Sequence, residues 1–240
     1  MGDINNIIMG RTHQAGASSN SAHLAILKNV YLWMTFALMI SGGVAALLAQ
    51  NSQILDLLFA NTFSILLVFA VQFGIVWFIS SRINSLSITS ATLLFILYAI
   101  ITGATLSTLF LAFTSESISS VFFMTAGTFA AMSLYGYTTK RDMSTIGSYL
   151  FMGVIGLIIA SVVNLFMHSE TLYWIISYIG VAVFVALTAY DTQKVKEMAM
   201  QHAYAGEEIG QKVALMGALT LYLDFINLFI YLLRIFGRRK

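Results

Sequence analysis

Residues 213–236 read VALMGALTLYLDFINLFIYLLRIF, an apolar run interrupted by only two charged side chains, Asp224 and Arg234. A helix needs about 20 mostly apolar residues to cross the hydrocarbon core of a bilayer. This run is therefore long enough to span a membrane, and it carries a carboxylate near its middle.

The same hydrophobic character extends over most of the chain, which has 240 residues, 59% of them hydrophobic and 9% charged. Soluble domains carry about 25% charged residues. Six more apolar stretches of spanning length lie at residues 27–49, 61–80, 88–112, 118–138, 145–167 and 171–191. We predict an all-α integral membrane protein, with a bundle of seven transmembrane helices over residues 27–236. A flexible polar tail is expected at 1–26 and a basic C-terminal tail at 237–240.

Basic residues in the loops predict which side of the membrane each loop occupies. The first segment and the loops after the second, fourth and sixth stretches contain Lys or Arg, whereas the other three loops contain none. These basic residues are Arg11, Lys28, Arg82, Lys140, Arg141, Lys194, Lys196 and Lys212. Because basic loops favour the cytoplasm, we expect a cytoplasmic N-terminus.

The basic C-terminal tail does not fit this pattern, because seven full crossings place it on the other side. It contains Arg238, Arg239 and Lys240, and Arg234 closely precedes it. Two interpretations stay open: a full seventh crossing, or a re-entrant last segment whose backbone is buried in protein.

Asp224 is the main candidate for a functional residue, because a carboxylate at the bilayer centre costs about 2.5–3.5 kcal/mol on insertion scales. It must face the bundle interior, a partner or a wet cavity. Three- and four-residue steps place a set of polar or small residues on one helix face. These are Gly217, Thr220, Asp224, Asn227 and Tyr231. The stripe is typical of a pore lining; the alternative is an interhelical hydrogen bond that fixes the bundle.

Asp191 is the second candidate and is expected at the C-terminal end of the sixth helix. A negative charge there meets the negative end of the helix macrodipole, so Asp191 is a poor cap. The alternative is a solvated residue paired with Lys194 or Lys196. Arg82, at the end of the second helix, could reach Asp191 or could extend to lipid headgroups.

If the two aspartates approach each other, they titrate as a coupled pair. Carboxylate oxygens supplemented by carbonyls and water suit Ca²⁺, and protonation removes the ligand charge. Asp191 and Asp224 are thus a possible Ca²⁺ site, and no other cofactor is expected. The histidines lie in tails and loops without metal-ligand spacing; they are His13, His23, His168 and His202.

Small residues at four-residue spacing predict close helix packing. Three such pairs are Gly103 with Ser107, Gly127 with Ala131, and Gly156 with Ala160.

Three stretches carry a resemblance to a known family. They are ALTLYLDFINLFIYLLRIFG at 218–237, ALTAYDTQKVK at 186–196 and GYTTKRDMSTIGSYLFMGVIGLIIASVVNLF at 136–166. The chain resembles the Bax inhibitor-1 family in its YccA-like bacterial branch, from about residue 25 to the C-terminus. The LDFINLF signature is long and specific.

The resemblance implies six helices around a central seventh and a pH-sensitive calcium leak gated by two aspartates. Carried onto this chain, the sensor residues match Asp191 and Asp224, and the arginine that latches the pore closed matches Arg82. The resemblance also implies a bacterial inner membrane.

Three functions are weighed. The first is the pH-gated cation leak, with Thr220, Asn227 and Tyr231 as pore-lining residues. The second is a binding protein that restrains an FtsH-like membrane-bound ATP-dependent protease, with the N-terminal tail as a handle. The third, an intramembrane aspartyl protease, is disfavoured because the chain lacks both a Gly-x-Gly-Asp motif and proline. We therefore expect a non-enzyme that acts in the lipid bilayer as a monomer, without nucleic acid.

Overall fold

The computed structural model describes the backbone of residues 2–50 and 61–240, and the side chains from residue 21 onward within those ranges. Its helices are α1 Gly2–Leu48, α3 Thr62–Arg82, α4 Ile88–Ala112, α5 Ser115–Thr138, α6 Ser144–Met167, α7 Glu170–Gln201 and α8 Glu207–Phe236. Within the described residues, seven helices are long and apolar enough to cross a membrane, the first of them over Ser21–Leu48. The predicted seven-helix bundle is confirmed. The side chains of 1–20, which include Arg11 and His13, lie outside the description, so the mobility of a tail over 1–26 stays a prediction.

Short polar caps explain why the helices begin where they do. The side chain of Asn61 accepts a hydrogen bond from the backbone N–H of Ser64 at 2.9 Å, at the start of α3. The side chains of Ser87, Thr114 and Ser169 do the same at the starts of α4, α5 and α7. Such caps satisfy N–H groups that have no partner within the helix. Thr114 and Ser169 come two residues after the ends of α4 and α6, so these two connections are short.

Two predicted helix ends are wrong: α7 continues to Gln201 and α8 already begins at Glu207. Hydropathy marks only the part of a helix that lies in the membrane, and backbone hydrogen bonds continue beyond it. Lys194, Lys196 and Lys212 are therefore helical residues. Asp191 lies well inside α7, so the macrodipole argument for it does not hold.

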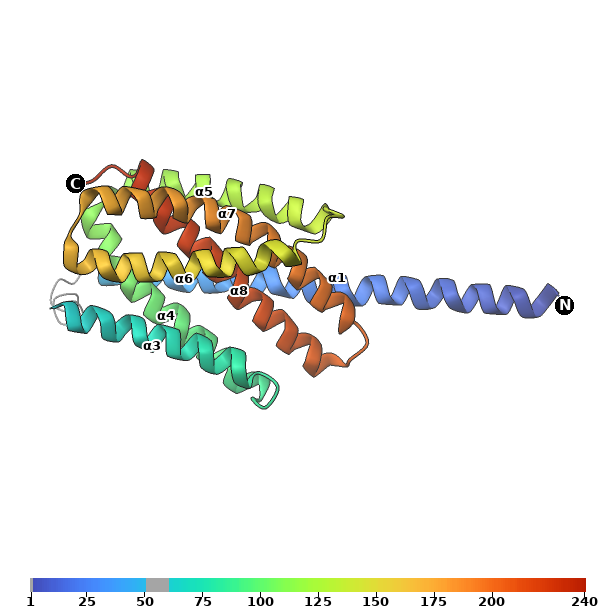
Figure 1. The fold of residues 1–240 in the computed structure, drawn as a ribbon. Coiled ribbons are helices and arrows are strands. Elements are labelled where there is room, and N and C mark those ends of the chain that lie inside the picture. Colours follow the sequence, from blue (N-terminus) through green and yellow to red (C-terminus); the bar gives the residue numbers. More distant parts are fainter. Residues whose placement is uncertain (1, 51–60) are drawn as a thin grey trace.

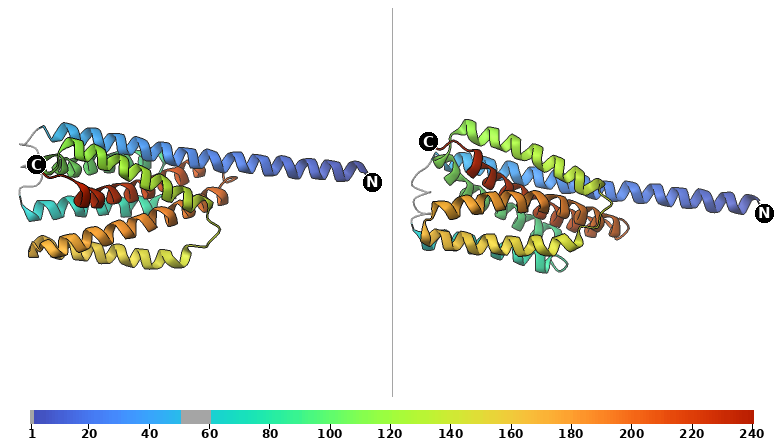
Figure 2. Two further views of the ribbon diagram at one scale, coloured as in Figure 1. Left: turned by 90° about the horizontal axis from the view of Figure 1, so that it is seen from above. Right: turned by 45° about the horizontal axis from the view of Figure 1, so that its top comes forward.

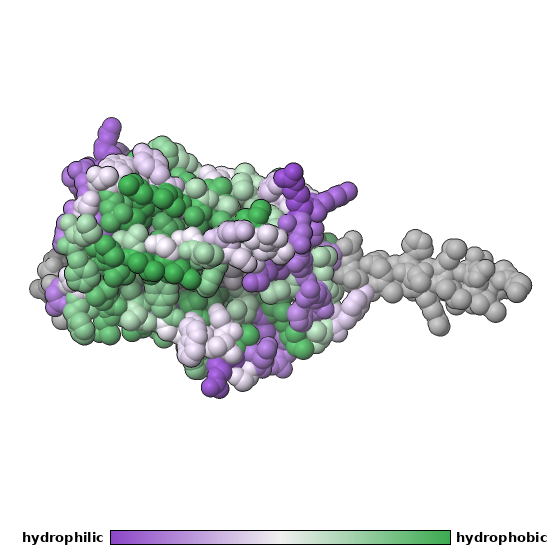
Figure 3. All heavy atoms as spheres, in the orientation of Figure 1, coloured by the Kyte–Doolittle hydropathy of each residue, from purple (hydrophilic) through white to green (hydrophobic). Residues whose placement is uncertain are grey.

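Helix α8 is the centre of the bundle. Buried residues make up 72% of its apolar stretch, against 6% for α6 and 11% for α3. Helices α1, α4, α5 and α7 pack directly on α8, whereas α3 packs mainly on α4 and α6 mainly on α7. The expected central seventh helix is confirmed, with α3 and α6 on the outside (Figure 1). Hydrophobic residues dominate the middle of the face in Figure 3, and hydrophilic residues gather toward its two ends.

The chain termini lie at opposite ends of the molecule (Figures 1 and 2). Helix α8 runs without a break from the short 202–206 connection to Phe236. We call the end of the bundle with connections 83–87, 139–143 and 202–206 the basic end, and the other end the far end. The last segment crosses the bundle completely, so the re-entrant interpretation is wrong and the basic tail lies at the far end.

A buried polar cluster fixes α8 to α1 and α4. The Ser41 hydroxyl lies 2.6 Å from the Tyr222 hydroxyl and 2.8 Å from the carbonyl oxygen of Ala99. Tyr222 is fully buried, and the rings of Phe95 and Tyr98 pack edge-on against it. The Ser41 hydroxyl thus joins α1 to both α4 and α8.

We expect Tyr222→Phe to destabilise the bundle by about 1 kcal/mol, the order of an interhelical hydrogen bond in a membrane. The hydroxyl is lost while the ring packing stays. Unfolding in mixed detergent micelles measures the change, and Tyr149→Phe serves as the control because Tyr149 is 70% exposed. Equal stability of the two variants would contradict a stabilising role for this bond.

The predicted close approaches at small residues are partly wrong. A Cβ at Gly103 would lie 2.7 Å from the carbonyl oxygen of Ser41, so glycine is required there by the contact of α4 with α1. A Cβ at Gly127 or Gly156 would have nothing within 4 Å. Spacing alone does not show which side of a helix is covered.

Candidate ion site at the paired aspartates

Asp224 is buried in the middle of the central helix, with 4% of its surface exposed. Its Oδ2 atom has no hydrogen-bond partner among the described residues. A buried polar atom without a partner is costly and calls for an explanation such as an ion or a functional role. Asp224 is thus the least satisfied polar residue of α8.

Asp191 on α7 is 9% exposed, and its carboxyl lies within hydrogen-bonding range of the carboxyl of Asp224. A carboxylate can only accept a hydrogen bond, so this contact needs a proton on one of the two groups. Lys194 is close enough to attract Asp191 electrostatically. It forms no ion pair among the described residues, and its ammonium lies 5.9 Å from the centre of the Tyr190 ring. The alternative of a solvated Asp191 paired with a lysine is not what the structure shows.

Small residues bring α7 close to its neighbours on both sides of the aspartate pair. A Cβ at Gly217 of α8 would lie 2.9 Å from the side chain of Val195, and one at Gly180 would lie 2.7 Å from the ring of Tyr231. Gly136 of α5 abuts the backbone of Ala189, two residues before Asp191. How closely these helices pack therefore determines the distance between the carboxyl groups of Asp191 and Asp224.

Hydroxyl groups around Asp191 were missed by the sequence analysis. Thr188 lies one turn before Asp191 and donates to the carbonyl oxygen of Phe184 at 2.8 Å. Thr192 donates to the Ser133 hydroxyl of α5 at 3.2 Å, and both threonines are buried. The only available signal was the four-residue step from Thr188 to Thr192, which is too common to single out.

The three proposed pore-lining residues have different surroundings in the structure. Thr220 and Asn227 are half-buried and donate to carbonyl oxygens of their own helix, those of Met216 and Leu223. Tyr231 is buried and its ring stacks on Phe184 of α7, with 5.8 Å between ring centres. Asp224 lies between them on the sequence but faces Asp191. Their role in a pore stays a prediction.

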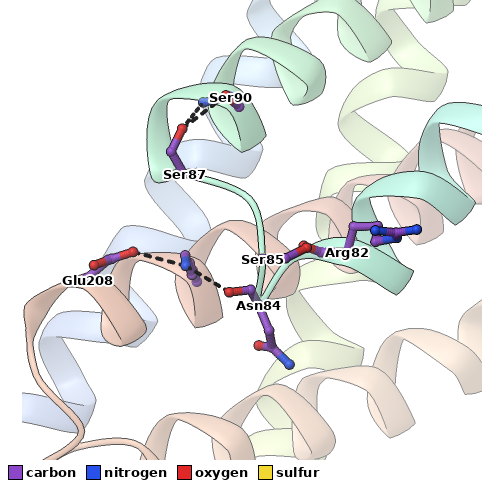
Figure 4. A network of polar contacts seen from close by, with 7 residues as sticks. Arg82, Asn84, Ser85, Ser87, Ser90 and Glu208 are labelled. Atoms are coloured by element: carbon purple, nitrogen blue, oxygen red, sulfur yellow. Dashed lines mark hydrogen bonds and ion pairs between the residues drawn. The ribbon is translucent and has the colours of Figure 1, made fainter.

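Arg82 is not brought to Asp191. It is exposed at the last turn of α3, and its side chain extends away from the α3–α4 connection (Figure 4). The ion pair in that region is instead Lys212 with Glu208, at 3.0 Å, and Lys212 also donates to the carbonyl oxygen of Asn84 at 3.4 Å. Lys212 thus ties α8 to the α3–α4 connection, and the latch role of Arg82 stays a prediction.

The aspartate pair has few other groups that could hold a metal ion. The described part of the chain has no group of three or more His, Cys, Asp or Glu side chains near one another. Ca²⁺ takes six to eight oxygen ligands. Water and main-chain or hydroxyl oxygens would have to supply the rest.

The fold and the site define a class: a multi-pass α-helical membrane protein with a buried carboxyl pair between its central helix and the preceding one. Residues 23–240 match the family described as "Inhibitor of apoptosis-promoting Bax1". The chain belongs to the Bax inhibitor-1 family.

Individual relatives are bacterial. The inner membrane protein YbhL of Escherichia coli (strain K12) is 49% identical over 214 residues, covering 89% of this chain and 92% of the relative. A Borreliella burgdorferi protein is 45% identical over the same shares. A Rickettsia prowazekii protein is 44% identical over 211 residues, 88% of each chain. The family match over residues 23–240 reaches all seven spanning helices.

Proposed function

We propose that this protein is a pH-sensitive cation leak of the bacterial inner membrane, with Asp191 and Asp224 as its ion- and proton-binding groups. The single observation that carries the proposal is the carboxyl pair, buried between α7 and α8 with Asp224 Oδ2 unpartnered. Intramembrane ionisable residues mark ion or proton pathways by default. The inner membrane is the location named for the relative YbhL.

The pair responds to protons because its contact depends on one. With a proton on one carboxyl, the two groups attract each other across α7 and α8. With both ionised, two negative charges lie together in a low-dielectric interior, which favours separation or a bound cation. Lys194, on the same helix, attracts the carboxylate of Asp191.

Calcium is the cation we favour, since carboxylate oxygens are hard ligands. Metal binding requires deprotonated ligands, so Ca²⁺ occupancy should rise with pH. Ca²⁺ flux into proteoliposomes between about pH 6 and about pH 8, with Asp224→Asn for comparison, tests the proposal.

An arginine latch would need a rearrangement. In this structure the buried core comes from the packing around α8, and Arg82 lies outside it. Pairing of Arg82 with Asp191 would require α3 to move toward α7.

An enzyme is not part of the proposal. Two facing carboxyls are also what an intramembrane aspartyl protease uses, but the Asp224 segment reads Leu221, Tyr222, Leu223, Asp224 instead of Gly-x-Gly-Asp.

Regulation of a membrane-bound ATP-dependent protease is a second candidate, because α1 extends well past the bundle at the basic end (Figure 1). Deleting residues 1–20 keeps the apolar stretch from Ser21 onward. We expect the deletion to slow degradation by an FtsH-type protease and to leave ion flux unchanged, as measured by in vitro proteolysis beside the flux assay. Unchanged proteolysis would argue against the handle.

A further inference from the structure

A groove of about 310 Å³ lies between α1, α4, α5 and α8 in the half of the bundle near the far end. On α8 it is lined by Phe225, Ile226 and Phe229, so it begins directly after Asp224 and extends toward the far end. Its walls are mainly apolar and include Leu38, Gly42, Leu106, Phe110, Phe122 and Phe229. A groove of this size can hold part of a small apolar ligand.

The groove is positioned where a lipid chain of the bilayer could enter it. Its α5 wall ends in Phe122 and Phe123, which are 39% and 73% exposed on the side of the bundle. Its α1 wall runs from Leu38 to Ala45, which corresponds to about 10 Å along a helix. This wall runs roughly parallel to a lipid chain, because transmembrane helices and acyl chains both run across the bilayer.

The basic C-terminal tail lies next to this groove, at the far end of the bundle. The backbone of the basic tail pairs with the α4–α5 turn: Thr114 N–H donates to the Arg238 carbonyl oxygen, and Lys240 N–H donates to that of Ala112, both at 3.0 Å. The Arg238 N–H donates to the Ser117 hydroxyl at 2.8 Å. The Lys240 ammonium donates to the carbonyl oxygen of Phe110, a groove residue, at 2.7 Å.

The cations of this tail have different surroundings. Arg234 and Arg239 each lie 5.4 Å from the centre of the Tyr173 ring. Arg238 and Lys240 are exposed and have no carboxylate partner among the described residues. The exposed Lys240 ammonium therefore lies at groove residue Phe110, and the backbone of the exposed Arg238 is held at the α4–α5 turn.

We propose that this groove binds one acyl chain of an acidic phospholipid, whose phosphate contacts Arg238 and Lys240. Apolar walls match the chain, and the anchored basic tail matches the headgroup in charge and position. A phospholipid has both chemistries joined at the membrane interface, where the groove meets the tail. It also explains why basic residues lie at the far end, away from the other basic loops.

Two neighbouring glycines give a matched test. A Cβ at Gly42 or Gly43 would have nothing within 4 Å, so both sites accept a larger side chain. Gly42 lines the groove, whereas Gly43 is not among its lining residues. Gly42→Leu should fill the groove and Gly43→Leu should not. Ser119→Leu, in the α5 wall, and Ser120→Leu, outside it, form a second pair should Gly42→Leu fail to fold.

The experiment is native mass spectrometry of the detergent-solubilised full chain with added phosphatidylglycerol or phosphatidylcholine. We expect the wild type to prefer phosphatidylglycerol. Gly42→Leu should bind it at least about tenfold more weakly, about 1.4 kcal/mol, while Gly43→Leu binds as the wild type does. Replacing Arg238 and Lys240 together by Gln should remove the preference between the two lipids.

Three results would overturn the proposal. They are equal wild-type binding of the two lipids, equal binding by Gly42→Leu and Gly43→Leu, and a preference that survives the loss of both cations. A fourth, loss of a dimer in Gly42→Leu with unchanged lipid binding, would assign the groove to a second copy of the chain.

Discussion

Asp224→Asn is expected to leave the protein folded and to remove the pH dependence of its Ca²⁺ flux. The amide keeps the shape of the side chain and can still hydrogen-bond Asp191, but it does not titrate. The ratio of flux at about pH 8 to flux at about pH 6 should fall to near one. Proteoliposomes loaded with a Ca²⁺ indicator provide the measurement.

The chemistry of the ligands determines whether Ca²⁺ binding rises or falls with pH. Carboxylates bind Ca²⁺ only when ionised, so acid should release the ion and alkali should favour it. Asp191→Asn should weaken binding in the same way, because it removes the negative charge of the other ligand of the pair. The double variant with Asp191→Asn and Asp224→Asn should lose no more Ca²⁺ binding than either single variant, since the two groups titrate as one unit.

Asp142→Asn is the matched control for this experiment. Asp142 is fully exposed in the α5–α6 connection, and its carboxylate accepts the backbone N–H of Ser144 at 2.8 Å. That hydrogen bond lowers the pKa of Asp142, so the group stays ionised throughout the range tested. Flux in Asp142→Asn should respond to pH as in the wild type. A normal pH response in both Asp191→Asn and Asp224→Asn would show that the pair is structural.

Gly136→Ala is expected to destabilise the protein by about 3 kcal/mol or more, at or beyond the usual upper range for overpacking. A Cβ at Gly136 would overlap the backbone carbonyl of Ala189 on α7. Backbone atoms have no rotamer by which to move away, so α5 and α7 would have to separate. Unfolding in mixed micelles gives the change in stability.

Gly127→Ala provides the contrast on the same helix. The new methyl group would have nothing within 4 Å, and alanine favours a helix over glycine by about 0.5–1 kcal/mol. Stability should therefore stay the same or rise slightly. A Gly136→Ala variant as stable as Gly127→Ala would show that α5 and α7 are not in tight contact at Gly136.

The Gly136 contact also bears on the candidate site. Ala189 lies two residues before Asp191, so separating α5 from α7 shifts the carboxyl relative to Asp224. We expect any Gly136→Ala protein that folds to show altered pH dependence of flux.

Asp224 was predictable from sequence because its physical cost is independent of the fold. A carboxylate in the middle of a spanning stretch is expensive wherever the neighbouring helices lie. Asp191 was identified as a candidate for the wrong reason, since α7 continues to Gln201 and Asp191 does not lie at the end of the helix. Its pairing with Asp224 could be stated only as a condition.

Arg82, Gly127 and Gly136 show where sequence reasoning reaches its limit. Arg82 is close to Asp191 only if α3 and α7 are neighbours, and α3 packs mainly on α4. Gly127 has the spacing of a packing motif but faces open space, whereas Gly136 lies against a neighbouring backbone. Which helices meet, and on which faces, depends on long-range packing that no short pattern records.

By itself the sequence determined the seven spanning segments and the intramembrane carboxylate, because both follow from the free energy of moving single groups into lipid. It also identified the family through specific motifs. Only the tertiary structure decided that Asp191 meets Asp224, that the last helix crosses completely, and that the basic tail lies beside an apolar groove. These facts concern pairs of distant residues, and inside a membrane they are set by close packing and interhelical hydrogen bonds.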